Sequence, residues 1–161
     1  PCGLLGGAFF EIRLVNIHLH HGGNNSSDNL IKRIEEFKTV TSDIYDSISK
    51  KCYGNHMPAY TIVLGDYNLS CVICEQQRET SITYLVETEQ TDKTTLSSTK
   101  DELVNDYDHI SYSKKRFEGT EITIQRVDSV RKYANSDFDL HRKEISDHVP
   151  IKLELILNPR R

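Results

Sequence analysis

The feature that most constrains this chain is a short apolar run that ends at two polar side chains. Residues 60–64, Tyr-Thr-Ile-Val-Leu, are apolar or β-branched and predict a buried strand. Gly65 permits a tight exit from that strand, so Asp66 and Asn68 can point the same way. A carboxylate beside a carboxamide at a strand end suits a hydrated cation together with a phosphate oxygen. Asp, Asn and Gly are also ordinary turn residues, and on this stretch alone both interpretations stay open.

Three further apolar segments carry polar residues in a similar way. They are residues 14–19 with His18, residues 106–112 with Asp108, and residues 145–151 with Asp147 and His148. Four such clusters are hard to explain as four independent turns. If each segment is a strand, the polar ends can meet at one edge of a sheet, and the pattern predicts a single site.

A helix is predicted between the first two of these segments. From about Ser27 to Lys51, apolar residues recur mainly at steps of three, four and seven, which places them on one stripe. Gly54 and Pro58 end the helix. Residues 3–19 are interpreted as a hairpin whose second strand precedes the helix. Strand, helix and strand together predict a parallel crossover unit.

Three histidines lie close together near the end of the first strand, at positions 18, 20 and 21. Alternation along a strand places His18 and His20 on one face and His21 on the other. We expect His18 alone to be functional, with His20 and His21 on the rim of the following loop.

The remainder of the chain alternates strand patterns with polar segments. We expect strands at residues 81–86, 107–113, 122–127 and 150–157, a polar loop at 87–101, a helical turn within 126–133 and a charged loop at 135–144. Strands that alternate with one clear helix predict an α/β fold with a mixed sheet.

The charge balance does not indicate a nucleic-acid footprint. The formal net charge is −4, which lowers the expectation of tight non-specific DNA binding but does not exclude metal-bridged phosphate chemistry. The short basic run Lys114-Lys115-Arg116 could touch a phosphate backbone or could be a solvated loop. No apolar run approaches the roughly 20 residues that span a bilayer.

The four polar clusters also resemble the motifs of a known family. Asn-Ile-His-Leu, Gly-Asp-Tyr-Asn, Tyr-Asp-His-Ile and Ser-Asp-His-Val-Pro begin at positions 16, 65, 107 and 146. In this order they resemble the endonuclease/exonuclease/phosphatase superfamily, which includes pancreatic-type deoxyribonucleases, abasic-site endonucleases, bacterial sphingomyelinases and inositol-phosphate phosphatases. The resemblance runs from about Ala8 to Leu155. It implies half of a four-layer α/β sandwich with a mixed, largely antiparallel β-sheet.

The resemblance implies catalytic roles for the matched histidines and acids. His18 is similar to the family's first catalytic histidine, which hydrogen-bonds the scissile phosphate, and His148 is similar to the second. Asp108 matches the acid that orients that second histidine. Asp66 and Asn68 match the pair that orients the attacking water and holds a phosphate oxygen.

The resemblance also implies a metal and a substrate class. Asp147 matches the metal-side carboxylate, so Mg²⁺ or Mn²⁺ is the expected cofactor. The implied activity is divalent-metal-dependent phosphodiester hydrolysis, by a nuclease before any other enzyme of this fold, with nucleic acid as the expected substrate.

One departure from the family pattern is large. In the family, a first half supplies a metal-binding glutamate, an asparagine and the acid that pairs with the first histidine, and no residue ahead of His18 matches them. We therefore expect residues 1–161 to be a single partial domain, the carboxyl-terminal portion of such a domain, and a poor catalyst by itself. A half-sandwich would leave an apolar sheet face for the amino-terminal half or a partner to cover.

Two alternatives remain open at this point. The chain could be an inactive half-domain that serves as a binding or structural module. It could also be a phosphatase-like or sphingomyelinase-like phosphoesterase of the same fold, although the absence of Trp slightly disfavours a lipid substrate.

Overall fold

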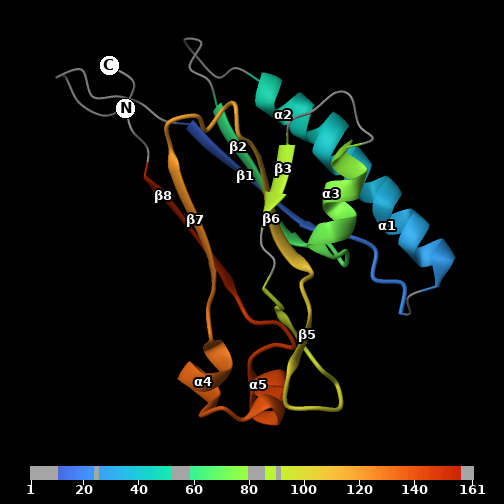
Figure 1. Ribbon diagram of the computed structural model, residues 1–161, viewed down its shortest axis with the longest axis vertical. Helices are drawn as coiled ribbons and strands as arrows, with labels where there is room; N and C mark the ends of the chain where they lie inside the picture. The colour runs from blue at the N-terminus through green and yellow to red at the C-terminus, as the bar shows by residue number, and fades with distance from the viewer. Residues whose placement is uncertain (1–10, 24–25, 52–58, 80–85, 90–91, 157–161) are drawn as a thin grey trace.

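The centre of the protein is a mixed β-sheet of four strands (Figure 1). The computed structural model describes residues 11–23, 26–51, 59–79, 86–89 and 92–156. In order across the sheet, the strands are β1 (Glu11–His18), β2 (Ala59–Asp66), β6 (Asp108–Ser113) and β3 (Val86–Glu89). β1 and β2 are parallel, whereas β6 is antiparallel to both β2 and β3.

Helices cover one face of this sheet. Helices α1 (Ser27–Thr39) and α2 (Tyr45–Lys50) connect β1 to β2, and α3 (Cys71–Glu79) follows β2. Phe37 of α1 packs in one buried cluster with Val63 of β2. The predicted crossover unit is therefore confirmed, because β1 and β2 are parallel neighbours joined by helices, and the fold is α/β.

A π-helical turn, η1 (Val40–Ile44), lies inside the long helix that the sequence predicts. The helical span itself is as predicted, and Ser26 caps its start by accepting a hydrogen bond from the Asn29 amide at 3.4 Å. Such π turns insert one extra residue into a helix. Here the turn leaves both Val40 and Tyr45 buried against the sheet.

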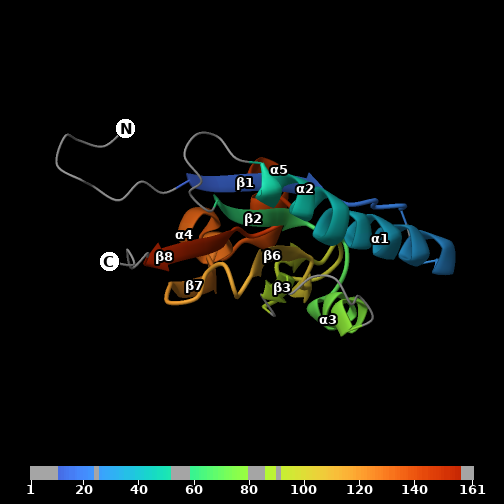
Figure 2. The ribbon, with the colours of Figure 1, turned by 90° about the horizontal axis from the view of Figure 1, so that it is seen from above.

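A two-stranded antiparallel sheet covers the opposite face of the central sheet. It consists of β7 (Glu121–Arg126) and β8 (Ile151–Ile156), which pair antiparallel. Ile62 of β2 and Tyr112 of β6 are buried in a second cluster with the inward residues of this β7–β8 sheet. The β7–β8 sheet, the central sheet and the helices are thus three successive layers (Figure 2).

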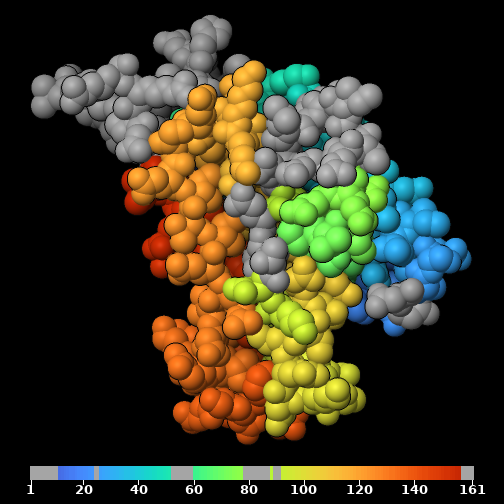
Figure 3. Space-filling view, viewed as in Figure 1, coloured from blue at the N-terminus to red at the C-terminus, as the bar shows by residue number. Residues whose placement is uncertain are grey.

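A smaller lobe lies below the sheet in the view of Figure 1, and Figure 3 shows it from the same side. It contains β4 (Thr95–Leu96), β5 (Leu103–Asn105), α4 (Ser129–Ala134) and α5 (Phe138–Glu144). A third buried cluster at its centre includes Leu96, Val130 and Val149. The turn between α5 and β8 starts in this lobe and carries Asp147 and His148 toward the sheet.

The structure corrects two of the sequence predictions. Residues 71–79 form a helix, where we assigned no element, and α5 replaces most of the charged loop predicted at 135–144. Helix α5 is capped by Asp137, whose side chain accepts from the Leu140 amide at 2.8 Å. Its buried residue is His141. An apolar stripe is therefore missing from α5, and periodicity could not reveal it.

Other predictions fall partly outside the described residues. The hairpin strand at residues 3–10 lies outside them, as does most of the predicted strand at 81–86. The predicted polar loop at 87–101 includes all of β3 except Val86, and it contains β4. Strands β6, β7 and β8 match their predicted ranges within two residues.

One strand presents apolar side chains to solvent. Ile12 and Leu14 of β1 are 45% and 65% exposed. Their register partners in β2 are Tyr60 and Ile62, which pack against the β7–β8 sheet. The apolar face of the central sheet therefore extends beyond the β7–β8 sheet that covers it. Within the described residues, no helix is both long and apolar enough to cross a membrane.

Candidate active site

The predicted site residues line one pocket with a volume of about 640 Å³. They are His18, Asp66, Asn68, Asp108, Asp147 and His148. The predicted clustering of these six side chains is therefore confirmed. The pocket also includes residues that we did not predict, namely Asn16, His21, Thr95, Asn105 and Tyr107.

Strand register explains how three of these side chains come together. His18 is the register partner of Asp66, and Asp66 is the register partner of Asp108. The three residues therefore form a row across β1, β2 and β6 at one edge of the sheet. Register partners on neighbouring strands present their side chains to the same face, where they lie within interaction distance.

His148 reaches this row from the turn before β8. Its Nδ1 donates a hydrogen bond of 2.6 Å to Asp108 Oδ2, as predicted, and its Nε2 lies 3.8 Å from Asp66 Oδ2. The hydrogen bond to Asp108 raises the pKa of His148, and the charges of Asp66 and Asp147 act in the same direction. Burial opposes them without reversing the shift. The charged form of His148 is thus favoured at the site.

Asp66 is the carboxylate that both histidines share. Its Oδ2 lies 3.5 Å from His18 Nε2, and its Oδ1 accepts the Asn68 amide at 2.8 Å. Burial raises the pKa of Asp66, against the opposing effects of the Asn68 amide and of His148. A carboxylate with a raised pKa is a stronger base for a proton from water.

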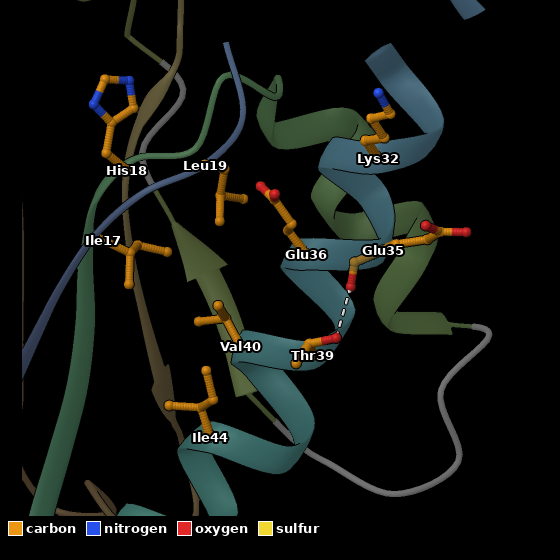
Figure 4. Close-up of a pocket in the computed structure, with 9 residues that line it drawn as sticks. All are labelled: Ile17, His18, Leu19, Lys32, Glu35, Glu36, Thr39, Val40 and Ile44. Atoms are coloured by element: carbon orange, nitrogen blue, oxygen red, sulfur yellow. Dashed lines mark hydrogen bonds between the residues drawn. The ribbon is translucent and has the colours of Figure 1, made fainter. Parts of the chain in front are cut away.

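His18 projects from the edge strand on the same side as Asp66. Figure 4 shows Ile17 and Leu19 pointing toward helix α1, while His18 points away from it. Ile17 and Leu19 line a second pocket, of about 500 Å³, between β1 and α1. The His18 side chain is 68% exposed, so its ring is far less enclosed than that of His148.

Asn68 is buried and tightly held. Its backbone is left-handed, with φ of 49°, and its side-chain amide donates to Leu19 O at 3.0 Å. Its Oδ1 lies 3.2 Å from His21 Nδ1, so His21 is the donor. Arg33, buried in α1, donates to the carbonyls of Asn68 and His21. Asn68 therefore organises the loops around the pocket.

His21, which we expected on the rim of the following loop, also lines the pocket. That His18 alone of its segment is functional stays a prediction. Strand β1 ends at His18, so the alternation that separated His21 from the site does not apply beyond it. Gly22 and Gly23 then adopt positive φ angles of 69° and 65°. No pattern in the sequence placed His21 at Asn68. His20 behaves as predicted, with its ring 3.1 Å from Asn29 Oδ1 and away from the pocket.

Gly65 sets the approach of β1 and β2 just before the site. Its φ of 141° is a conformation that favours glycine. A Cβ at this position would lie 1.9 Å from the carbonyl oxygen of Ile17. The two strands can therefore be this close only because residue 65 has no side chain.

The described residues do not form a metal site by themselves. No group of three or more His, Cys, Asp or Glu side chains among them is placed to hold a metal ion. Asp147, the expected metal ligand, is exposed at the mouth of the pocket. Binding of Mg²⁺ or Mn²⁺ by Asp147 stays a prediction.

The basic run Lys114-Lys115-Arg116 does not contribute to this pocket. It follows Ser113, at the opposite end of β6 from Asp108, and all three residues are exposed. The structure thus agrees with the solvated-loop interpretation.

Two solved structures are similar to this chain. They are the cytolethal distending toxins of Haemophilus ducreyi, with a TM-score of 0.43, and of Actinobacillus actinomycetemcomitans, with a TM-score of 0.45. Each is 17% identical and is matched over 87% of this chain. The chain spans about half the length of these solved chains, 47% and 48%. No protein-family model and no curated protein sequence matches the chain.

Proposed function

We propose that this pocket catalyses the hydrolysis of phosphodiesters, with nucleic acid as the foremost substrate. The observation that carries the proposal is the chain of contacts Asp108, His148, Asp66 and His18 in one pocket. It supplies two imidazoles as donors to phosphate oxygens and one carboxylate of raised pKa as a base.

The proton and bond changes of the proposed reaction can be balanced with these groups. Asp66 takes a proton from water as the water oxygen forms its bond to phosphorus. The bond from phosphorus to the leaving oxygen breaks, and protonated His148 gives that oxygen its proton. Asp108 holds the His148 ring in place throughout. His18, at the open side of the pocket, would donate to a non-bridging phosphate oxygen.

The proposal includes a divalent cation. Asp66, Asp108 and Asp147 all line the pocket, and its described lining contains no Lys or Arg. A phosphodiester anion would meet this negative charge unless a cation offset it. Asp147 is the residue that we expect to contribute an oxygen to Mg²⁺ or Mn²⁺, with phosphate oxygens and a carboxylate from outside the described residues completing the shell.

A second candidate function is that of a binding module. It is favoured by the exposed Ile12 and Leu14, which extend the apolar face of the sheet. We propose that the amino-terminal half of a longer protein, or a partner chain, covers them.

The pocket lining also favours an alternative substrate within the same reaction class. Because the described lining contains no Lys or Arg, that alternative is a small phosphoester.

The test is hydrolysis of bis-(p-nitrophenyl) phosphate and of plasmid DNA in the presence of Mg²⁺ or Mn²⁺. Because the family resemblance places further catalytic groups in another half, we expect slow turnover by this chain. The decisive quantity is therefore the ratio between the chain and its His148→Ala variant. His20→Ala is the matched control, since His20 contacts Asn29 instead of the pocket.

Three outcomes separate the candidates. Turnover that is lost in His148→Ala and kept in His20→Ala supports the hydrolase. Shifts of the His18 and His148 ring resonances on titration with the diester, without any turnover, would favour the binding module. If neither turnover nor shifts occur with any metal, both hydrolysis and binding of the diester by this pocket are excluded.

A further inference from the structure

A buried histidine of helix α5 anchors the turn that carries His148. His141 is 0% exposed, and its Nδ1 lies 2.8 Å from the carbonyl oxygen of Ser146. A carbonyl oxygen can only accept, so Nδ1 carries the ring proton and donates it. The Ser129 hydroxyl lies 2.7 Å from His141 Nε2 and forms the second hydrogen bond of the ring.

Ser146 connects this anchor to His148. The Ser146 Oγ accepts the His148 amide at 3.0 Å, and the Ser146 amide donates to the carbonyl of His141 at 2.9 Å. His148 in turn donates to Asp108 at 2.6 Å. A continuous path of hydrogen bonds therefore runs from His141, through the turn, to the acid on β6.

The remaining contacts of the turn restrain the neighbours of His148. The Leu96 amide donates to the carbonyl of Asp147 at 2.7 Å, and the Val149 amide donates to the carbonyl of Thr94 at 2.8 Å. These bonds fix where the turn lies along β4. The amide of His148 itself bonds to Ser146, the residue that His141 holds.

We propose that His141 is a positioning residue for His148, acting through its Nδ1–H on the Ser146 carbonyl. Fixing that carbonyl fixes the Ser146 hydroxyl and the His148 amide, and so directs the His148 ring at Asp108. A residue that merely filled the core would need its volume but no donor at this position. The inference concerns the orientation of His148 and does not depend on hydrolysis.

Two substitutions of His141 separate these roles. The amide of His141→Asn can reach the position of Nδ1 and keep the bond to Ser146, whereas the amide of His141→Gln reaches the position of Nε2 and keeps the bond to Ser129. Each variant loses one buried hydrogen bond, so we expect both to lower the midpoint of thermal unfolding to a similar extent. Ser129→Ala is a further control, because it leaves the bond to Ser146 intact.

The readout is the Nδ1–H proton resonance of His148 at fixed pH, identified by its loss in His148→Gln. A 2.6 Å bond to a carboxylate places this resonance at low field. We expect it to persist in His141→Asn and Ser129→Ala, and to shift or broaden in His141→Gln. If the protein is active, turnover should fall by about 10-fold or more in His141→Gln alone.

Opposite results would overturn the proposal. If the resonance follows thermal stability in all three variants, His141 is a core residue only. If His141→Gln does not fold, Ser129→Ala still decides, since loss of the resonance there contradicts a role through Nδ1–H. A preserved pattern of resonances without phosphodiester turnover would leave this inference intact and remove the proposed function alone.

Discussion

Two histidines of the pocket, His18 and His148, share one carboxylate but lie in very different surroundings. The His148 side chain is 22% exposed and bonds Asp108 at 2.6 Å, whereas the His18 side chain is 68% exposed and lies 3.5 Å from Asp66. The His148 ring is therefore held in a defined orientation before any substrate binds, whereas the more exposed His18 ring can adopt several orientations. The difference shows that the described residues fix the His148 ring more firmly than the His18 ring.

The largest expected effect concerns activity. If the comparison is correct, His148→Ala should reduce phosphodiester turnover by about 10³-fold, within the range of general acid catalysis. The reduction of turnover in His18→Ala should be about 10-fold smaller, because a hydrogen bond from a solvent-exposed donor is weaker than one from a buried donor. Steady-state kinetics with bis-(p-nitrophenyl) phosphate measure both. Equal losses in the two variants would contradict the comparison.

The next effect concerns the acid behind His148. The pKa of His148 is raised above its ordinary value of about 6.5, mainly by Asp108. The pair therefore stabilises the fold fully below about pH 6.5, and this contribution is lost as the pH rises through the folded pKa. We expect Asp108→Asn to reduce the free energy of unfolding by about 2 kcal/mol near pH 5.5. The reduction should be smaller near pH 9 in urea titrations, and a loss independent of pH would be the contrary result.

A smaller effect of opposite sign is expected at Asp66. Burial raises the pKa of Asp66, so its favourable contribution is present below the unfolded pKa of about 3.9 and is lost as the pH rises through the folded pKa. At neutral pH the ionised Asp66 carboxylate lowers the free energy of unfolding. Asp66→Asn keeps the acceptor for the Asn68 amide and removes the charge, so thermal unfolding should occur at a higher temperature at pH 7, but not near about pH 3. Asp147→Asn, at an exposed carboxylate, is the control and should change little.

The smallest effect should be that of His18 on stability. Because its ring is exposed, His18→Ala should change the free energy of unfolding by less than about 0.5 kcal/mol. His148→Ala removes the 2.6 Å hydrogen bond to Asp108 and should cost more. Denaturation of the two variants under one condition sharpens the comparison. A large loss in His18→Ala would show that His18 is as firmly held as His148.

The fold could be predicted wherever one face of an element is apolar. The stripe from Ser27 to Lys51 and the run at residues 60–64 identified the helical crossover, because burial against the sheet requires those side chains. Helix α5 escaped prediction because a hydrogen-bonded histidine occupies its buried face. Burial of polar residues depends on hydrogen-bond partners that are distant in sequence, and the periodicity of apolar residues does not reveal those partners.

The candidate site could be predicted in its composition but not in its geometry. Polar residues at strand ends indicated His18, Asp66 and Asp108, yet only strand register places them in a row. His21 could not be found, since its approach to Asn68 depends on positive φ angles in the loop that follows it. Register and loop conformation arise from the whole fold.

The absent side chain at position 65 has a consequence for how the pocket tolerates change. The distance between the ends of β1 and β2 is set by backbone against backbone, with nothing between them that a different rotamer could move aside. Most positions around a pocket offer a graded series of substitutions, from small to large. Position 65 offers none, because alanine already adds the atom that collides with the Ile17 carbonyl. Any side chain at position 65 would therefore force β1 and β2 apart and change the spacing of His18 and Asp66. Substitutions of neighbouring side chains could not compensate, because the collision is with a backbone atom.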